Sequence, residues 1–392
     1  MNQPTLIDSH AHLDGSRFNE DLDEVIQRAS AAGVNKIITV GCDLESSSAG
    51  VCLSKRYPAL FATLGVHPHD AVQLTPDVLE QFRQLAQNEK VVAIGEIGLD
   101  YFRNRCPHDQ QQLAFRQQIQ LAKQLKLPII VHDRDAHSDV LQILSEEDAG
   151  QFGGVLHCFS GNLEMANRCI EMGFHLSFTG TITYPKNDKI REIIRNIPTG
   201  SIMVETDCPY LAPQQWRGKR NEPAYVVKTA EQIAQIKQLS FSDIARITSV
   251  NANRLFGLGA VSQGGKIAYL IRNSLYLNIT NRCSNHCTFC AKLRDFNVKG
   301  HHLKLDHEPD FTEVIAAIGD PSQYDEVVFC GYGEPLLRLE LVKEIAAWLK
   351  QRQVKVRINT DGQANLVYDR DITPELSGLI DEISISLNAP DA

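Results

Sequence analysis

The chain has 392 residues, of which 43% are hydrophobic and 22% charged, and its formal net charge is −9. This composition is that of a soluble globular protein, and the negative charge argues against a broad basic surface for nucleic acid, although bound divalent cations would offset local carboxylates. The length is too great for a single hydrophobic core and predicts two or three domains.

The N-terminus and the cysteines indicate the compartment. The start, MNQPTLIDSHAHLD, has no basic segment followed by an apolar run, so no signal peptide is predicted. No apolar stretch approaches the roughly 18 residues that a membrane helix needs, so no membrane partner is expected. The ten cysteines are then reduced thiols or metal ligands, not a disulfide framework. A cytoplasmic location is expected.

Short apolar runs alternate with amphipathic helical patterns through residues 1–210. The predicted strands are, in chain order, 5–10, 36–41, 61–67, 91–96, 128–133, 154–159, 175–180 and 202–207. Eight alternations of strand and helix predict a parallel sheet with right-handed crossovers that closes into a (β/α)8 TIM barrel. Two helices, 223–239 and 241–256, are expected after the last strand.

Histidines and carboxylates recur where these strands end, which is where barrels of this type hold their active sites. The candidate ligands are His10, His12, Glu96, His132, His157 and Asp207. His10 and His12 are two residues apart in an extended segment, so both imidazoles can reach one ion. Mixed imidazole and carboxylate ligands suit Zn²⁺, Mn²⁺, Fe²⁺ or Mg²⁺. Because so many ligands exceed the needs of one zinc ion, two divalent ions with a shared bridge are predicted.

Other residues near these strand ends are open to two interpretations. Glu205 points the opposite way along its strand from Asp207 and is predicted to be structural. His67 and His69 follow the third strand, where they either cap and pack or, in the case of His67, contact the scissile phosphate.

The loop WRGKRNEP, residues 216–223, places Arg217, Lys219 and Arg220 beside Trp216. The three cations are either a solvated surface or a grip on substrate phosphates, with Trp216 stacked on a base. Their position after the strand that carries Asp207 favours the second interpretation.

Seven segments together resemble the TatD family of metal-dependent deoxyribonucleases, over residues ~5–257 and in the family order. They are DSHAHLD, GVHPH, GEIGLDYF, PIIVHDRDA, LHCFSG, ETDCPYL and RGKRNEP. The resemblance implies a metal-dependent hydrolase barrel that cleaves phosphodiester bonds in DNA, as a single strand or at a 3′ end, with two divalent ions such as Mg, Mn or Zn.

The resemblance also implies the role of each ligand. His10, His12, Glu96 and Asp207 would hold one ion, and Glu96, His132 and His157 would hold the second, so Glu96 is the bridge. Asp207 is expected to orient or deprotonate the attacking water. The expected catalytic set is thus Asp207, Glu96 and His67.

The composition changes near residue 260, where a glycine-rich turn replaces the helical pattern, so domains of 1–259 and 260–392 are expected. Strands are predicted in the second domain at 274–280, 326–331, 354–360 and 382–388, with helical patterns at 310–318 and 337–352.

Cys283, Cys287 and Cys290 follow the first of these strands in the spacing C-x3-C-x2-C. Three thiolates leave one iron of a [4Fe–4S] cluster without a protein ligand, because the usual cluster takes four cysteines. An open iron is what a small molecule needs to bind. A zinc site with His286 as the fourth ligand and an accidental group of free cysteines are the alternatives.

The cysteine spacing after a strand is similar to that of the radical SAM superfamily, over residues ~266–392. GYGEP, residues 331–335, resembles its glycine-rich motif, in which Gly331 and Gly333 would admit S-adenosylmethionine and Glu334 would accept from its amino group. Asn359 would lie near the ribose. The resemblance implies a partial β/α barrel and reductive cleavage of S-adenosylmethionine to a 5′-deoxyadenosyl radical. Superfamily members usually have six β/α units, so the domain is expected to be cut short.

Three functions fit these patterns. The first is a TatD-like phosphodiesterase fused to a radical SAM enzyme. The second keeps the two-metal barrel but hydrolyses an amide or an aminoacyl ester, since the fold does not fix the substrate. The third is a non-catalytic, metal-stabilised scaffold for the cysteine domain, against which the intact ligand set argues. The protein partner is unknown in each case.

Overall fold

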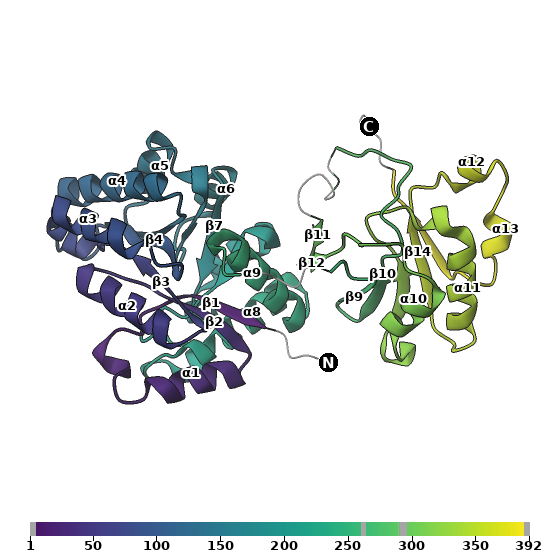
Figure 1. The fold of residues 1–392 in the computed structure, drawn as a ribbon, viewed down its shortest axis with the longest axis horizontal. Helices are drawn as coiled ribbons and strands as arrows, with labels where there is room; N and C mark the ends of the chain where they lie inside the picture. The colour runs from purple at the N-terminus through teal and green to yellow at the C-terminus, as the bar shows by residue number, and fades with distance from the viewer. Residues whose placement is uncertain (1–4, 260–263, 289, 291–295, 388–392) are drawn as a thin grey trace. The chain divides into compact units, whose positions relative to one another are not determined.

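The computed structural model describes residues 5–259, 264–288, 290 and 296–387 (Figure 1). The chain divides into two compact units, Met1–Gly259 and Ala260–Ala392. None of the described helices combines the length and the apolar character that crossing a bilayer requires.

The first unit is built on an eight-stranded sheet in which each strand pairs in parallel with the next along the chain. The strands are β1 (Leu6–Ala11), β2 (Val34–Thr39), β3 (Leu60–Leu64), β4 (Val91–Asp100), β5 (Ile129–Arg134), β6 (Gly154–Leu156), β7 (Phe174–Phe178) and β8 (Ile202–Val204). A bridge between Ala11 and Cys208 joins the two ends of the sheet. The predicted (β/α)8 barrel is therefore confirmed.

Helices lie outside these strands (Figure 1). They are α1 (Leu22–Ala31), α2 (Leu44–Arg56), α3 (Pro76–Leu85), α4 (His108–Leu125), α5 (His137–Glu146), α6 (Leu163–Glu171), α7 (Asp188–Asn196), α8 (Val226–Lys237) and α9 (Phe241–Phe256). Their ends follow from local chemistry: Asp43 and Ser240 form capping boxes at the starts of α2 and α9. Gly257 ends α9 with a positive φ of 61°.

The second unit holds a five-stranded sheet in the order β15-β14-β13-β10-β9. Its strands are β9 (Ala268–Ile271), β10 (Ser274–Leu277), β13 (Glu326–Phe329), β14 (Val356–Thr360) and β15 (Glu382–Ile385), with a small pair β11 (Asn297–Val298) and β12 (His301–His302) apart from them. The four predicted strands are present and parallel. β9 is an antiparallel addition that was not predicted from the sequence. The last predicted strand extends to Asn388, which lies outside the described residues.

The helices of the second unit are α10 (Phe311–Ile318), α11 (Leu339–Lys350), α12 (Ala364–Tyr368) and α13 (Thr373–Leu376). Val342, Ile345 and Leu349 of α11 pack with Val327 and Ile358 of the sheet into one apolar core. The apolar clusters of the barrel contain residues of the first unit alone. Each unit thus has a core of its own.

Deleting residues 261–392 is expected to leave the barrel folded and active, because no apolar cluster of the barrel loses a member. Calorimetry should find the melting temperature of the barrel changed by less than about 3 °C, which for a domain of this size corresponds to about 1 kcal/mol. A larger fall, or loss of hydrolysis, would show that the second unit is an integral part of the hydrolase.

A candidate metal centre in the barrel

The predicted ligands of the first unit come together at the carboxyl ends of the strands. β1 supplies His10 and, one residue beyond its end, His12, while the other ligands come from β4, β5 and the segments after β6 and β8. A cavity of about 890 Å³ opens onto them, lined by His12, Glu96, His132, His157 and Asp207 among others. His10 is fully buried behind it.

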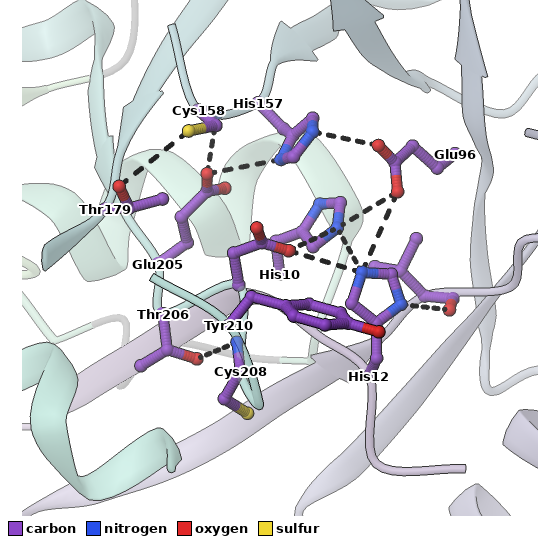
Figure 2. A network of polar contacts seen from close by, with 12 residues as sticks. His10, His12, Glu96, His157, Cys158, Thr179, Glu205, Thr206, Cys208 and Tyr210 are labelled. Atoms are coloured by element: carbon purple, nitrogen blue, oxygen red, sulfur yellow. Dashed lines mark hydrogen bonds and ion pairs between the residues drawn. The ribbon is translucent and has the colours of Figure 1, made fainter. Parts of the chain in front are cut away.

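The two carboxylate oxygens of Glu96 face two different pairs of imidazoles. Oε1 lies 2.7 Å from His132 Nδ1 and 2.9 Å from His157 Nε2. Oε2 lies 3.4 Å from His10 Nε2 and 3.8 Å from His12 Nε2. Figure 2 shows Glu96 between His157 on one side and His10 and His12 on the other. This arrangement suits a carboxylate that bridges two ions.

We call His10 and His12 the first ligand set and His132 and His157 the second. Asp207 belongs to the first ligand set. Its Oδ1 lies 3.3 Å from His12 Nε2 and 3.7 Å from His10 Nε2. Its backbone N–H donates to the carbonyl of His10 over 2.9 Å, which fixes the loop after β8 against β1. Asp207 also has a positive φ of 55°, a conformation that Asp tolerates better than most residues.

In three of the candidate histidines, the ring nitrogen that points away from Glu96 (the outer nitrogen) faces an acceptor, while the other (the inner nitrogen) faces Glu96. His12 Nδ1 lies 3.2 Å from the carbonyl of Val40, His132 Nε2 lies 3.2 Å from Asp100 Oδ2, and His157 Nδ1 lies 3.4 Å from Glu205 Oε1. A proton held on the outer nitrogen leaves the inner lone pair free for a ligand. Glu205 thus lies behind His157, as its predicted structural role requires.

The inner nitrogens lie close to one another. His10 Nε2 and His12 Nε2 are 3.2 Å apart, and His132 Nδ1 and His157 Nε2 are 3.3 Å apart. Two lone pairs at this distance repel each other unless a proton or a cation lies between them. Each pair also faces one oxygen of Glu96, so the donors present fit two divalent cations of the kind that imidazole and carboxylate bind.

His67 lies beside His132 and His157, but its hydrogen bonding indicates a donor. Its Nε2 lies 3.6 Å from Glu96 Oε1, and its Nδ1 accepts a hydrogen bond from the backbone N–H of His69. Burial lowers the pKa of His67 well below its usual value, so the ring is neutral. With Nδ1 an acceptor, the single proton is on Nε2, which makes His67 a hydrogen-bond donor inside the cavity.

Asp100 is a member of the site that the sequence reasoning missed. Its fully buried carboxylate contacts His132, as above, and lies 2.8 Å from His69 Nε2. The signal was available, because Asp100 stands at the end of β4, the strand that carries Glu96. Gly98 lies between them with φ +139°, and a Cβ there would come within 2.0 Å of the His132 carbonyl.

The charges of the cluster depend on one another. Burial favours a raised pKa for Glu96, but the imidazoles around it outweigh burial and hold that pKa well below its usual value. Burial acts to lower the pKa of His157, but Glu96 and Glu205 outweigh it and hold that pKa well above its usual value. Asp100 and Glu96 similarly raise the pKa of His132. Without an ion, both imidazoles therefore bind protons more tightly than a free imidazole does.

Binding of a divalent ion at pH 7 is therefore expected to release about one proton or more, because the ion displaces protons from His132 and His157. Protonated imidazole cannot ligate, so the apparent affinity should rise as pH increases through these raised pKa values. Titration calorimetry with Mn²⁺ in two buffers of different ionisation enthalpy measures the release. Equal enthalpies in both buffers would contradict it, and His157→Asn should lower the number released.

The basic loop after β8 does not line the cavity. Arg220 pairs with Asp21 at 2.6 Å, and the guanidinium of Arg217 lies 4.4 Å from the ring centroid of Tyr184. Lys219 is exposed. The grip of Arg217, Lys219 and Arg220 on substrate phosphates stays a prediction, since none of the three lines the cavity and Arg220 is paired with Asp21.

Trp216 is also engaged elsewhere, since its ring stacks on Tyr225 with centroids 3.8 Å apart. The cations that do line the cavity are Arg17, Arg103, Arg105 and Arg134. Arg134 ends β5, and the other three follow β1 and β4; none of the four was predicted as a site residue.

The cysteine loop of the second unit is held to the end of β14. Ser284 Oγ donates to Asp361 Oδ2 over 2.6 Å, and Gln363 Nε2 donates to Asn285 Oδ1 over 2.9 Å. Cys283, Cys287 and Cys290 are partly buried, and none is in a disulfide. Phe289 lies outside the described residues. Three thiols on one short loop fit the ligand set of an iron–sulfur cluster.

The four residues predicted to contact S-adenosylmethionine also lie close to, or hydrogen-bond with, other atoms of the protein. A Cβ at Gly331 would come within 2.1 Å of Asn278 Oδ1, and one at Gly333 within 2.3 Å of the Thr280 carbonyl. The buried carboxylate of Glu334 accepts hydrogen bonds from Leu336 N, Thr360 Oγ1 and Asp361 N. Asn359 Oδ1 accepts from Arg357 over 2.8 Å. Packing therefore accounts for both glycines, and Glu334 positions the loop after β14.

A closed (β/α)8 barrel with buried imidazoles and carboxylates at its carboxyl end defines a metal-dependent hydrolase. The family model of TatD related DNase matches residues 7–257, and that of the Radical SAM superfamily matches residues 277–392. The chain belongs to the TatD-related DNase family and carries a radical SAM domain after the barrel. Both resemblances predicted from the sequence are confirmed.

Relatives cover the barrel almost completely. The chain is 47% identical over 251 residues to the uncharacterized metal-dependent hydrolase YabD of Bacillus subtilis, covering 64% of this chain and 98% of that protein. It is 37% identical over 256 residues to the 3′-5′ ssDNA/RNA exonuclease TatD of Salmonella typhimurium, covering 64% and 98%. Among solved structures, the Escherichia coli TatD homolog YJJV matches with a TM-score of 0.61 and 34% identity, covering 64% of this chain and 98% of that chain.

Proposed function

We propose that the barrel hydrolyses phosphodiester bonds of a nucleic acid strand with two divalent ions, Mg, Mn or Zn, around Glu96. The observation that carries this proposal is the division of the Glu96 oxygens between two pairs of inward-facing imidazole nitrogens. When bound, two such ions would polarise a phosphoryl oxygen and lower the pKa of a water molecule. The exonuclease name of the Salmonella relative supports the choice of substrate.

The residues of the chain then have separate tasks. His10, His12 and Asp207 would hold one ion, His132 and His157 would hold the other, and Glu96 would contribute to both sites. Asp207 lines the cavity and can orient the attacking water or take its proton.

His67 lines the same cavity with its proton on Nε2, so it can donate a hydrogen bond to an oxygen of the scissile phosphate. This assignment keeps the predicted role of His67 and explains why it lies beside the second ligand set.

Hydrolysis of an amide or an aminoacyl ester is the second candidate, because the same donors could serve it. The cavity arginines favour the phosphodiester, since an anionic strand needs cations that a neutral amide does not. The test is one panel: labelled single-stranded DNA, bis(p-nitrophenyl) phosphate, amides and aminoacyl esters, each with Mg²⁺, Mn²⁺ or Zn²⁺. Turnover of the amides or esters alone would overturn the proposal, and no turnover at all would favour the scaffold.

For the second unit we propose a [4Fe–4S] cluster on Cys283, Cys287 and Cys290 and reductive cleavage of S-adenosylmethionine. The superfamily match and the cysteine spacing support this. His286, the fourth ligand of the alternative zinc site, is exposed. A cytoplasmic location and a protein partner stay predictions from the sequence.

A further inference from the structure

Two aromatic side chains next to the metal centre are unusually exposed. Tyr210 in the loop after β8 is 53% exposed, and Phe102 in the loop after β4 is 56% exposed. The ring of Tyr210 lies 6.2 Å from that of His12 (Figure 2). Phe102 is two residues beyond Asp100, which contacts His132. Tyr210 is thus associated with the first ligand set and Phe102 with the second.

The topology separates the two rings. The eight strands follow one another in order around the barrel, so β4 and β8 lie across it from each other. The loops that follow these strands leave the barrel at the same end, where the ligands are. Tyr210 and Phe102 therefore stand on opposite sides of the metal centre.

Tyr210 lines the cavity and Phe102 lies outside its wall, but each ring has arginine neighbours that line it. The guanidinium of Arg17 lies 5.5 Å from the ring centroid of Tyr210. Those of Arg134 and Arg103 lie 4.1 Å and 5.8 Å from the centroid of Phe102. Arg105 is a fourth cation in the cavity wall.

These four arginines lie in the cavity wall without a carboxylate partner among the described residues, although three of them already contact an aromatic ring. Within the part of the chain that the structure describes, no carboxylate lies within 4.0 Å of any of their guanidinium nitrogens. Arg28 and Arg220, outside the cavity, are by contrast paired with Glu222 and Asp21. Unpaired cations beside exposed rings, in a cavity with a metal centre, suit a ligand that alternates negative charge with flat apolar groups.

We propose that Tyr210 and Phe102 stack on the bases at either side of the scissile phosphate, while the four arginines contact neighbouring phosphates. This inference rests on the proposed phosphodiester hydrolysis and sets its specificity. A base must be out of the duplex stack to offer its face to a protein ring, so the cavity takes an unpaired strand. Stacking accepts every base, so little sequence preference follows.

The test pairs protein variants with abasic sites in a single-stranded oligodeoxythymidylate. In the wild type, removing the base on either side of the cleaved bond should lower kcat/KM roughly tenfold, the usual effect of one lost stacking partner. In Tyr210→Ala, the abasic site on one side should have no further effect, while the site on the other side keeps its full effect. Phe102→Ala should show the reverse.

The controls separate stacking from folding. Tyr210→Phe and Phe102→Tyr keep a flat ring and should restore the wild-type response to both abasic sites. Leu113→Ala shortens an aliphatic side chain that is 51% exposed on α4 and offers no ring for stacking, so this variant should behave as the wild type. Equal effects of both abasic sites in the wild type and in both alanine variants would overturn the inference.

Failure of the proposed function is distinguishable. If the wild type cleaves no oligonucleotide, the proposed hydrolysis is wrong, and fluorescence anisotropy in EDTA then tests the inference alone. Tyr210→Ala and Phe102→Ala should each weaken binding of a labelled single strand roughly tenfold, with little change for a duplex. Unchanged affinity for the single strand would overturn the stacking surface.

Discussion

Replacing Glu96 with alanine is expected to lower kcat/KM for single-stranded DNA by more than about a thousandfold. The substitution removes the one side chain whose oxygens face both ligand sets, and a two-ion centre supplies several kcal/mol of transition-state stabilisation. Glu96→Gln, which keeps the shape but not the charge, should be almost as inactive. Elemental analysis should find fewer than two ions per chain in both variants.

Glu89→Ala is the matched control for this experiment, because Glu89 is exposed in the turn before β4 and should keep the wild-type rate and metal content. More than about a tenth of the wild-type rate in Glu96→Ala would contradict the two-ion centre, since that small loss corresponds to only about 1.4 kcal/mol.

Replacing Cys287 with alanine is expected to abolish the iron–sulfur cluster of the second unit. Anaerobic reconstitution of the wild type should give about four irons per chain and a broad absorption in the blue, as a [4Fe–4S] cluster requires. The two thiols that remain on the loop are too few to bind the cluster, so the variant should lose both the iron and the absorption.

Cys52→Ala is the control, since Cys52 is exposed on α2 of the barrel and should leave iron content and absorption unchanged. One stoichiometric zinc in the purified wild type, bound through the cysteine loop, would show instead that the second unit is a zinc site.

The metal ligands could be predicted from the sequence because two simple rules place them. Side chains two apart in a strand share a face, which joined His10 with His12, and parallel strands bring their carboxyl ends to one edge, which joined these with Glu96 and Asp207. The division of the Glu96 oxygens could not be predicted in the same way, since it depends on side-chain rotamers.

The residues that were missed or misplaced depend on contacts made across the fold. Arg17, after β1, and Arg134, at the end of β5, line the cavity, whereas Arg220, in the segment after β8, pairs with Asp21. Glycines 331 and 333 fit a ligand motif, and a Cβ at either would also meet protein atoms, the Asn278 side chain in one case and the Thr280 and Arg282 carbonyls in the other. Spacing alone cannot distinguish a glycine that admits a ligand from one that admits a neighbouring strand.

The residues of the first proposed ion site come from both ends of the barrel sheet, so an ion bound there would hold β1 and the segment after β8 together. His10 and Asp207 come from the first and last strands, whose segments meet through Asp207 N to His10 O and His12 N to Cys208 O. In a barrel open between β1 and β8 these residues would lie apart, so that half of the proposed centre would be incomplete. An ion that binds only the closed form shifts the equilibrium toward closure. Metal bound at the proposed site would therefore stabilise the closed barrel as well as support the proposed hydrolysis.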